Sequence, residues 1–126
     1  MAILGLGVDV VEINRFKKIK NNKKIIKRIF TTYENRYCEN KNKILCFAKR
    51  FAAKEAFVKA LGMGFRDGIN LSNIEIKNSK LGMPSIVISK FLKKKIIKKF
   101  KLKKFKVFLS ISDEKKYAIA NVIITK

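Results

Sequence analysis

Two carboxylates and one lysine stand out as residues that could perform chemistry. Asp9 is the acid within an otherwise apolar segment, and Glu55 and Lys59, four residues apart, project from one face of a predicted helix. Two hard oxygen donors, completed by phosphates and waters, suit Mg²⁺, and a lysine can take a phosphate as a point charge. The alternatives are a helix-capping or salt-bridged Asp9 and a surface Glu55–Lys59 pair worth roughly 0.2–0.5 kcal/mol.

The absence of histidine narrows the possible chemistry. With no histidine in 126 residues, the chain has no Ser-His-Asp or Cys-His catalysis, no His-ligated zinc and no imidazole acid–base group. Catalysis must use carboxylates, lysine or a carboxylate-bound metal. Cys38 and Cys46 have neither CxxC spacing nor partner ligands for a metal, so we expect both to be reduced in a cytoplasmic protein.

The net charge predicts an acidic partner. Lysine and arginine number 31 against 9 acids, which gives +22 spread along the whole chain. Such a surface attracts nucleic acid, an anionic membrane, phosphorylated small molecules or an acidic protein, although a drift in composition toward lysine would also raise the charge. Asp9 and Glu12 interrupt the first apolar run, so we expect no signal peptide, and no run approaches the roughly 18 residues that cross a bilayer.

The predicted fold begins with a strand and helices that place Asp9. The apolar, β-branched segment Ile3–Val11 is predicted to be a buried strand, and apolar residues recur at helical spacing over residues 15–30. Asp9 then lies where the strand gives way to this helix. Thr31 and Glu34 form a capping-box pattern, which predicts the start of a second, short helix.

A longer helix carries the second candidate metal ligand, Glu55. It is predicted from Lys43 to Leu61 because its apolar residues recur at helical spacing, and Gly62 ends it. Ala52 and Ala56 lie beside Glu55 on this helix. Their small side chains would leave room for a bulky ligand to approach the helix backbone.

The second half of the chain is predicted to contain mainly β-structure. Strand-like runs are present at Ile74–Lys77, Ser85–Ser89, Phe105–Ser112 and Tyr117–Thr125. The only proline lies in the turn Leu81–Pro84, and the polar turn Asp113–Lys116 closes a terminal hairpin. Residues 90–106 contain ten lysines and no acid, and predict a helix with a narrow apolar face and a solvated lysine face. Residues 1–126 are therefore predicted to form a single α+β domain, its helical first half packed on a mainly antiparallel sheet.

The glycines of the first strand raise the question of a nucleotide-binding loop. Gly5 and Gly7 match the first two glycines of the G-x-G-x-x-G dinucleotide-binding motif, but Val10 occupies the position of its third glycine. Cations at residues 27–28 replace the acidic ribose ligand, and no GK[ST] follows. We interpret these glycines as easing the strand into a turn.

Four short segments of the sequence, taken together and in their order along the chain, form a pattern that can be compared with known families. Gly5–Ile13 reads GLGVDVVEI and is followed by Arg15, and Phe51–Lys59 reads FAAKEAFVK. The turn Leu81–Pro84 and the final run Tyr117–Ile124 follow. In this order and at this length, the segments closely resemble holo-[acyl-carrier-protein] synthases, the short 4′-phosphopantetheinyl transferases. The resemblance covers essentially the whole chain and implies the 4′-phosphopantetheinyl transferase fold.

The resemblance implies an activity and roles for the candidate residues. These enzymes move the phosphopantetheine arm of coenzyme A onto a serine of acyl carrier protein and release adenosine 3′,5′-bisphosphate. By resemblance, Asp9 and Glu55 hold Mg²⁺ on the pyrophosphate, and Lys59 neutralises phosphate charge, which makes Glu55 and Lys59 catalytic. The implied coenzyme A contacts are Arg50, Lys54, Lys59, Gly62, Gly64, Gly82, Pro84 and Ser112. The sequence leaves the base open, with a metal-adjacent water relayed by a carboxylate as the first candidate.

One position departs from the family pattern. Many members have Ser-x-Ser-His before the last turn, whereas this chain has Ser110-Ile111-Ser112-Asp113. A histidine contact to the nucleotide therefore does not carry over to this chain. Ser112 and neighbouring lysines are the candidates to replace it.

The resemblance also implies partners. Acyl carrier proteins are small and strongly acidic, so a basic docking face is expected at the first helix. Its candidate residues are Arg15, Lys17, Lys18 and Arg28. Similar family members are usually trimers with active sites at subunit boundaries, so a homotrimer is expected, with the apolar terminal strands in a shared core.

Two rival functions remain open at this point. A nucleic-acid or ribosome-associated binding module would use the +22 charge, but no RNP-type aromatic pattern, GXXG loop or zinc finger is present. That function would also leave Asp9 and Glu55 without a role. The other rival is a degenerate transferase, which the intact Asp9, Glu55 and Lys59 positions oppose.

Overall fold

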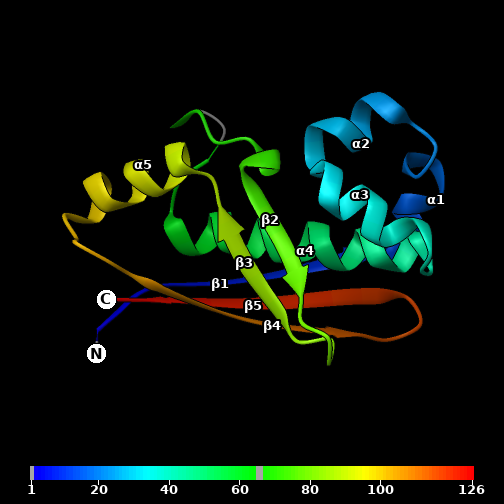
Figure 1. Cartoon of the computed structure of the whole chain (residues 1–126). Coiled ribbons are helices and arrows are strands. Elements are labelled where there is room, and N and C mark those ends of the chain that lie inside the picture. The colour runs from blue at the N-terminus through cyan, green and yellow to red at the C-terminus, as the bar shows by residue number, and fades with distance from the viewer. Residues whose placement is uncertain (1, 65–66) are drawn as a thin grey trace.

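The computed structural model describes residues 2–64 and 67–126 and forms an α+β domain (Figure 1). The elements follow in the order β1 (Ile3–Glu12), η1 (Ile13–Arg15), α1 (Phe16–Ile19), α2 (Lys23–Ile29), α3 (Thr32–Glu39), α4 (Lys43–Leu61), η3 (Leu71–Asn73), β2 (Ile74–Asn78), β3 (Pro84–Ile88), α5 (Lys90–Phe100), β4 (Lys106–Asp113) and β5 (Tyr117–Thr125). Strands β1, β5 and β4 form one antiparallel sheet in that order, and β2 and β3 form a separate hairpin. Figure 1 shows α4 lying along the sheet, with α1–α3 gathered near one end of this helix and α5 near the other. The predicted fold class is confirmed.

Helix α4 packs unusually close to β1. A Cβ atom on Gly7 would lie 1.9 Å from the carbonyl oxygen of Ala56, and one on Gly5 would lie 1.9 Å from that of Ala60. The glycines therefore allow the helix backbone to approach the strand, and the prediction that they ease a turn is wrong. Ala52 and Ala56 are fully buried in this contact. The room that we expected Ala52 and Ala56 to leave for a ligand is thus filled by the protein core.

The helix predicted over residues 15–30 is broken into η1, α1 and α2. The side chain of Asn22 accepts a hydrogen bond from the backbone N–H of Ile25 at 3.2 Å and so caps a new helix. Asparagine side chains compete with the helical backbone in this way, which favours helix starts over helix interiors. The capping box of Thr31 and Glu34 is confirmed at the start of α3.

Helix α4 has its predicted bounds, whereas the helix predicted over residues 90–106 ends six residues early, at Phe100. Lys101 follows in the left-handed region with φ of 53°. The lysine face of α5 is not entirely solvated, because the Lys99 Nζ donates to the carbonyl oxygens of Leu61 at 2.8 Å and Gly62 at 3.1 Å. Lys99 thus satisfies carbonyls at the C-terminus of α4 and complements the helix dipole.

The two cysteines form a disulfide, so the prediction that both are reduced is wrong. Cys38 lies near the end of α3 and Cys46 near the start of α4, with their Cα atoms 5.6 Å apart. The short connection between these helices turns the chain back and brings the two sulfurs together. Eight residues of sequence separation give no sign of that turn.

The face of the β1–β5–β4 sheet away from α4 is apolar and uncovered in the single chain. Leu6 of β1 pairs with Ile123 of β5, which pairs with Phe108 of β4, so the three share this face. Val8 and Val10 extend it along β1. Leu6 is 67% exposed, Val10 56% and Phe108 49%, which is unusual for apolar side chains in the middle of strands. We call Leu6, Val8, Val10, Phe108 and Ile123 the outer sheet face.

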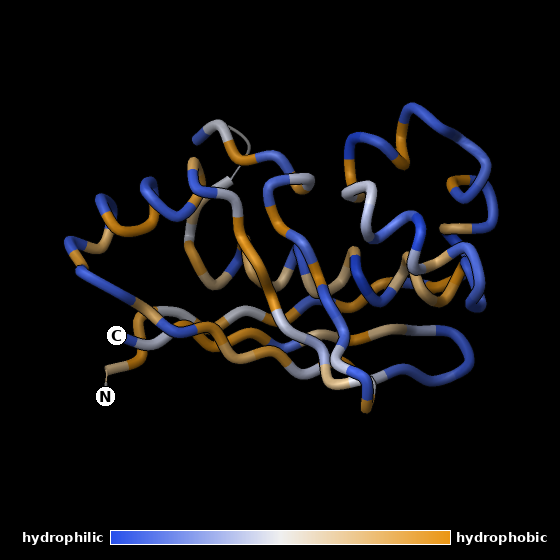
Figure 2. Tube along the Cα trace, in the orientation of Figure 1, coloured by the Kyte–Doolittle hydropathy of each residue, from blue (hydrophilic) through white to orange (hydrophobic). Residues whose placement is uncertain are grey.

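The apolar residues follow the sheet and α4, as Figure 2 shows, while the β4–β5 turn is hydrophilic. Among the described residues, no helix is both long enough and apolar enough to cross a membrane.

Candidate active site

Asp9 and Lys59 meet where β1 crosses α4. The Lys59 Nζ donates to Asp9 Oδ1 at 2.9 Å and to the backbone carbonyl of Val8 at 3.1 Å. The Asp9 side chain is only 14% exposed, whereas that of Lys59 is 55% exposed. The salt-bridged Asp9 that the sequence left as an alternative is therefore present, with its lysine at the surface.

Glu55 completes this cluster from the preceding turn of α4. Burial raises the pKa of the Glu55 carboxyl, and the neighbouring Asp9 charge raises it further, while Lys59 and Arg15 lower it. Two carboxylates that repel one another in a partly buried place are suited to a hard cation. Within residues 2–64 and 67–126 no third Asp, Glu or Cys joins them in a metal-binding group. The donor set therefore fits a cation that takes its other ligands from substrate phosphates and water.

A pocket of about 570 Å³, which we call the Glu55 pocket, opens beside this cluster. Its lining includes Ile25, Arg28, Ile29, Phe51, Glu55, Leu71 and Ser72. The Arg15 guanidinium lies 5.7 Å from the centroid of the Phe51 ring. Arg15 and Arg28 therefore flank the pocket, whereas Lys17 and Lys18 are exposed on α1 and do not line it.

Arg50 forms a second cluster beside α3 and β2. It is only 4% exposed; its Nη1 donates to Cys46 Sγ at 3.2 Å, its Nη2 donates to Asn78 Oδ1, and its guanidinium lies 4.4 Å from the Tyr37 ring centroid. Desolvation lowers the pKa of Arg50. Arg50 Nε is buried and has no hydrogen-bond partner among the described residues. Arg50 lines a pocket of about 150 Å³, which we call the Arg50 pocket, together with Lys41, Lys49 and Asn78.

The predicted coenzyme A contacts fall into two groups. Lys59 is nine residues after Arg50, which places the two side chains about 180° apart around the helix axis. Gly62 and Gly64 lie with Lys59 at the C-terminal end of α4. Gly82, in contrast, accepts a hydrogen bond from the Asn78 side chain at 3.1 Å, which places the β2–β3 turn and its Pro84 on the Arg50 side.

Ser112 and Asp113 lie at the end of β4. Ser112 pairs with Ile119 of β5, which in turn pairs with Val10, so Ser112 belongs to the same face as the outer sheet residues. The Asp113 carboxylate lies 3.5 Å from the Lys49 Nζ. Asp113 thus forms an ion pair with a residue of the Arg50 pocket.

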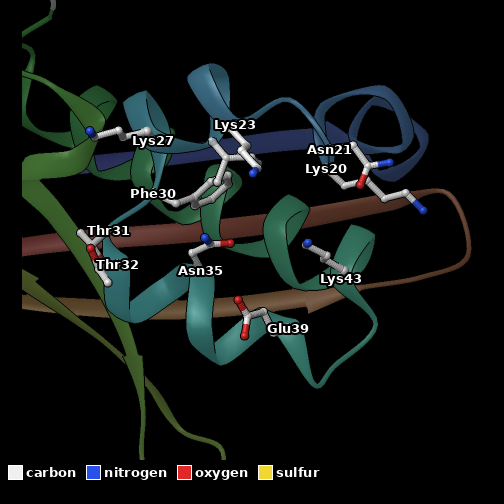
Figure 3. A pocket seen from close by; sticks show the side chains of 11 residues that line it. Lys20, Asn21, Lys23, Lys27, Phe30, Thr31, Thr32, Asn35, Glu39 and Lys43 are labelled. Carbon is white, nitrogen blue, oxygen red and sulfur yellow. The ribbon is translucent and has the colours of Figure 1, made fainter.

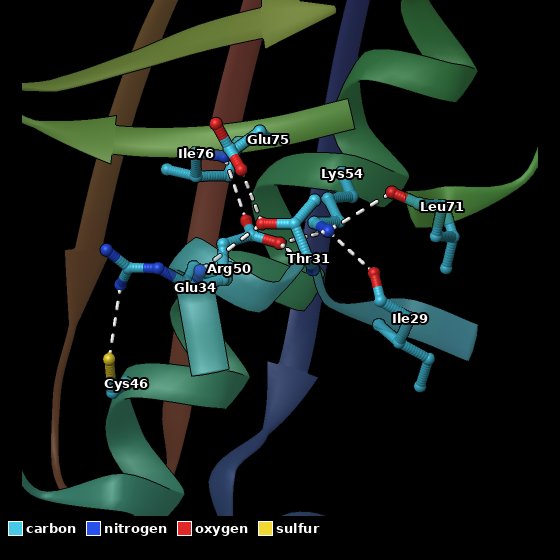
Figure 4. A network of polar contacts seen from close by, with 9 residues as sticks. All are labelled: Ile29, Thr31, Glu34, Cys46, Arg50, Lys54, Leu71, Glu75 and Ile76. Carbon is cyan, nitrogen blue, oxygen red and sulfur yellow. Dashed lines mark hydrogen bonds and ion pairs between the residues drawn. The ribbon is translucent and has the colours of Figure 1, made fainter. Parts of the chain in front are cut away.

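Lys54 is enclosed, and the prediction that it contacts coenzyme A is contradicted by its surroundings. Its side chain is 0% exposed, and its Nζ donates to Glu34 Oε1 at 2.5 Å, to the Ile29 carbonyl at 2.6 Å and to the Leu71 carbonyl at 3.1 Å (Figure 4). These three bonds use all three ammonium N–H groups. The KEA sequence puts Lys54 next to Glu55, but only the fold shows that the two side chains point to different places.

Sequence reasoning also missed a basic pocket of about 480 Å³ next to α2 (Figure 3). Its lining includes the lysines Lys20, Lys23, Lys27 and Lys43, with Ile26 and Phe30 as apolar residues. None of the predicted catalytic or docking residues lines it. The even scatter of lysine in the sequence gave no signal that could have separated these four from the others.

Comparisons with known proteins identify the family to which this chain belongs. The family model described as the 4′-phosphopantetheinyl transferase superfamily matches residues 5–122. The holo-[acyl-carrier-protein] synthase of Pelagibacter ubique is 50% identical over 127 residues, covering 100% of this chain and 99% of the relative.

Solved structures are similar over almost the same length. The crystal structure of holo-[acyl-carrier-protein] synthase from Neisseria meningitidis has a TM-score of 0.86 and 34% identity, covering 99% of this chain and 100% of that one. The enzyme from Bacillus anthracis, crystallised in complex with CoA (3′,5′-ADP), has a TM-score of 0.79 and 32% identity, covering 98% and 96%. On the match to the family model, the identity to these relatives and the shared fold, the chain belongs to the 4′-phosphopantetheinyl transferase superfamily and, within it, to the holo-[acyl-carrier-protein] synthases.

Proposed function

We propose that this chain transfers 4′-phosphopantetheine from coenzyme A to a serine of apo-acyl carrier protein in a Mg²⁺-dependent reaction that releases adenosine 3′,5′-bisphosphate. The observation that carries the proposal is the convergence of Asp9, Glu55 and Lys59 at one place, in a chain of this family. A nucleic-acid-binding module would have no use for two mutually repelling carboxylates on a surface of such positive charge.

The carboxylates and the lysine have complementary tasks. Asp9 and Glu55 are the residues that would hold Mg²⁺, which when bound supplies positive charge to the pyrophosphate of coenzyme A. Lys59 uses two of its three N–H groups on Asp9 and Val8, so one N–H is left for a phosphate oxygen. Its exposed ammonium can therefore compensate charge as the phosphoanhydride breaks.

The proposed reaction forms one P–O bond, breaks another and transfers one proton. The carrier serine oxygen attacks the phosphorus that bears the pantetheine arm, and the P–O bond to the 5′-phosphate of the nucleotide breaks. The serine proton passes to a base, and the nucleotide phosphate leaves with the electron pair of the broken bond. A water beside the metal, relayed by a carboxylate of the cluster, is our candidate for this base.

A homotrimer would complete the substrate site. Arg50 and Lys59 lie on opposite sides of α4, so a phosphate held by one is remote from the other within one chain. We place the nucleotide end of coenzyme A, with its 3′-phosphate, at the Arg50 pocket of a neighbouring copy, near Ser112 and Gly82. The outer sheet face supports this assembly, because so much exposed apolar surface is suited to burial between subunits.

The carrier protein is placed at the other side of the cluster. Arg15 and Arg28 flank the Glu55 pocket and would meet acidic residues of the carrier, while Lys17 and Lys18 would add longer-range attraction from α1. The carrier serine would then approach Glu55 from this pocket. The proposed location of the reaction is the cytoplasm.

The experiment that tests this function is a direct transfer assay. The protein is incubated with apo-acyl carrier protein, coenzyme A and Mg²⁺, and the carrier is weighed by mass spectrometry. We expect the carrier to gain the mass of phosphopantetheine, and to gain none when the divalent metal is chelated. A carrier that stays unmodified with Mg²⁺ present contradicts the proposal and favours a degenerate transferase or a binding module.

A further inference from the structure

The buried ion pair of Lys54 and Glu34 lies directly behind the Glu55 pocket. Both side chains are 0% exposed, and Figure 4 shows Lys54 reaching in three directions from α4. Two of its three bonds go to backbone carbonyls, those of Ile29 and Leu71. Burial of an ammonium group costs free energy, which its ion pair and hydrogen bonds must offset.

The two carbonyls belong to two different elements that line that pocket. Ile29 is the last residue of α2, and Leu71 is the first residue of η3. Both residues also line the Glu55 pocket. The carbonyl at the end of α2 lacks a partner within its own helix, and an ammonium there also complements the helix dipole. Lys54 thus ties two separate walls to one point on α4.

Glu34 fixes where that point lies. Its Oε1 accepts from the Thr31 backbone N–H at 2.9 Å as well as from Lys54, and its Oε2 accepts from the backbone N–H of Ile76 at 2.8 Å. These bonds join α3 to β2 and leave the Lys54 ammonium little freedom. Desolvation lowers the pKa of Lys54, and the Glu34 charge opposes that change by favouring the ammonium form.

We propose that Lys54 is a positioning residue that sets the spacing of the Ile29 and Leu71 walls of the Glu55 pocket and thereby determines affinity for the carrier protein. The inference rests on the proposed function, because it assigns the Glu55 pocket to the carrier. Neither Ile29 nor Leu71 lines the Arg50 pocket, where we place the nucleotide end of coenzyme A, although Ile76 of the Glu34 network does. The effect of Lys54 is therefore selective for one of the two substrates.

The test compares Michaelis constants for the two substrates. Lys54→Met removes both wall contacts and is measured beside Lys43→Met, which removes a half-buried lysine of the same helix that does not line the Glu55 pocket. We expect Lys54→Met to raise the Michaelis constant for the carrier roughly tenfold and to change that for coenzyme A less than about twofold, because small displacements of a docking wall weaken only the group it positions. Lys43→Met should change neither constant.

A second variant guards against loss of folding. Glu34→Gln/Lys54→Met removes both buried charges, which proteins tolerate better than one unpaired charge, and it still lacks the contacts to Ile29 and Leu71. Each variant is assayed well below its own midpoint of thermal unfolding. Equal changes in both Michaelis constants, or no change in either, would overturn the inference.

Binding of apo-carrier without coenzyme A separates this inference from the proposed function. Weaker binding by both Lys54 variants than by Lys43→Met supports the positioning role even where no transfer occurs. Unchanged carrier binding refutes the role of Lys54, although the wild type transfers phosphopantetheine normally. A wild type that fails to transfer refutes the proposed function alone.

Discussion

Replacement of Glu55 by glutamine should lower the transfer activity and raise the stability of the metal-free protein. The substitution keeps the shape of the side chain and removes one of the two carboxylates that the described residues bring to the cluster. Loss of one preorganised electrostatic contact of this kind typically lowers kcat by about 10²–10³, or roughly 2.7–4 kcal/mol of transition-state stabilisation. We expect transfer to fall by that amount and to recover little at high Mg²⁺.

The stability of the metal-free protein should change in the other direction. Burial and the Asp9 charge raise the pKa of Glu55 above its ordinary value of 4.5, so folding favours the protonated carboxyl. That contribution to stability is present below pH 4.5 and is lost as the pH rises through the folded-state pKa. At neutral pH the ionised Glu55 therefore destabilises the fold slightly, and Glu55→Gln should raise the midpoint of thermal unfolding. At acidic pH the gain should vanish.

The assay measures thermal unfolding between pH 4 and pH 8, with and without Mg²⁺, for the wild type, Glu55→Gln and Glu39→Gln. Glu39 is an exposed acid on α3, and its substitution makes the same change in net charge. Mg²⁺ should stabilise the wild type and Glu39→Gln but not Glu55→Gln, and Asp9→Asn combined with Glu55→Gln should lose little further activity, because both act through one ion. Near-normal transfer by Glu55→Gln at limiting Mg²⁺ would refute the assignment of Glu55.

Three other predictions concern the docking face, the disulfide and the outer sheet face. Arg15→Glu should weaken carrier binding by about 1–3 kcal/mol and reduce its salt dependence, whereas Lys94→Glu on exposed α5 should not; equal losses would mean that only net charge matters. Reduction of the Cys38–Cys46 bond, which spans 8 residues, should lower the free energy of unfolding by about 2.5 kcal/mol in chemical denaturation, and an unchanged midpoint would contradict this. Leu6→Asp should convert a trimer to monomers in light scattering and abolish transfer; an active monomer would refute the shared site.

Local patterns in the sequence were sufficient for most elements. The spacing of apolar residues determined α4 from Lys43 to Leu61, and the Thr31–Glu34 capping box determined the start of α3. The i, i+4 spacing of Glu55 and Lys59 was enough to put both on one side of that helix. These features depend on neighbours within about one helical turn, so the sequence contains all the information they require.

Only the tertiary structure showed where the side chain of Lys54, the neighbour of Glu55 in the same motif, lies. Lys54 adjoins Glu55 in the sequence, but its side chain points into the core, where Ile29, Glu34 and Leu71 surround it. The partners come from α2, α3 and η3, and no periodicity along the chain records which carbonyls will lie around a given ammonium. The close approach of Gly7 to Ala56 has the same character, because a glycine needed for contact looks identical to one needed for a turn.

The sequence by itself therefore indicated the family and the main helices and strands, and it singled out Asp9, Glu55 and Lys59, which the structure brings together. It could not divide the predicted coenzyme A contacts between the Arg50 and Lys59 sides of α4, nor pair Cys38 with Cys46. Those outcomes depend on how elements distant in the sequence pack together. Packing is decided by shape and burial across the whole domain, and only the folded chain brings those surfaces into contact.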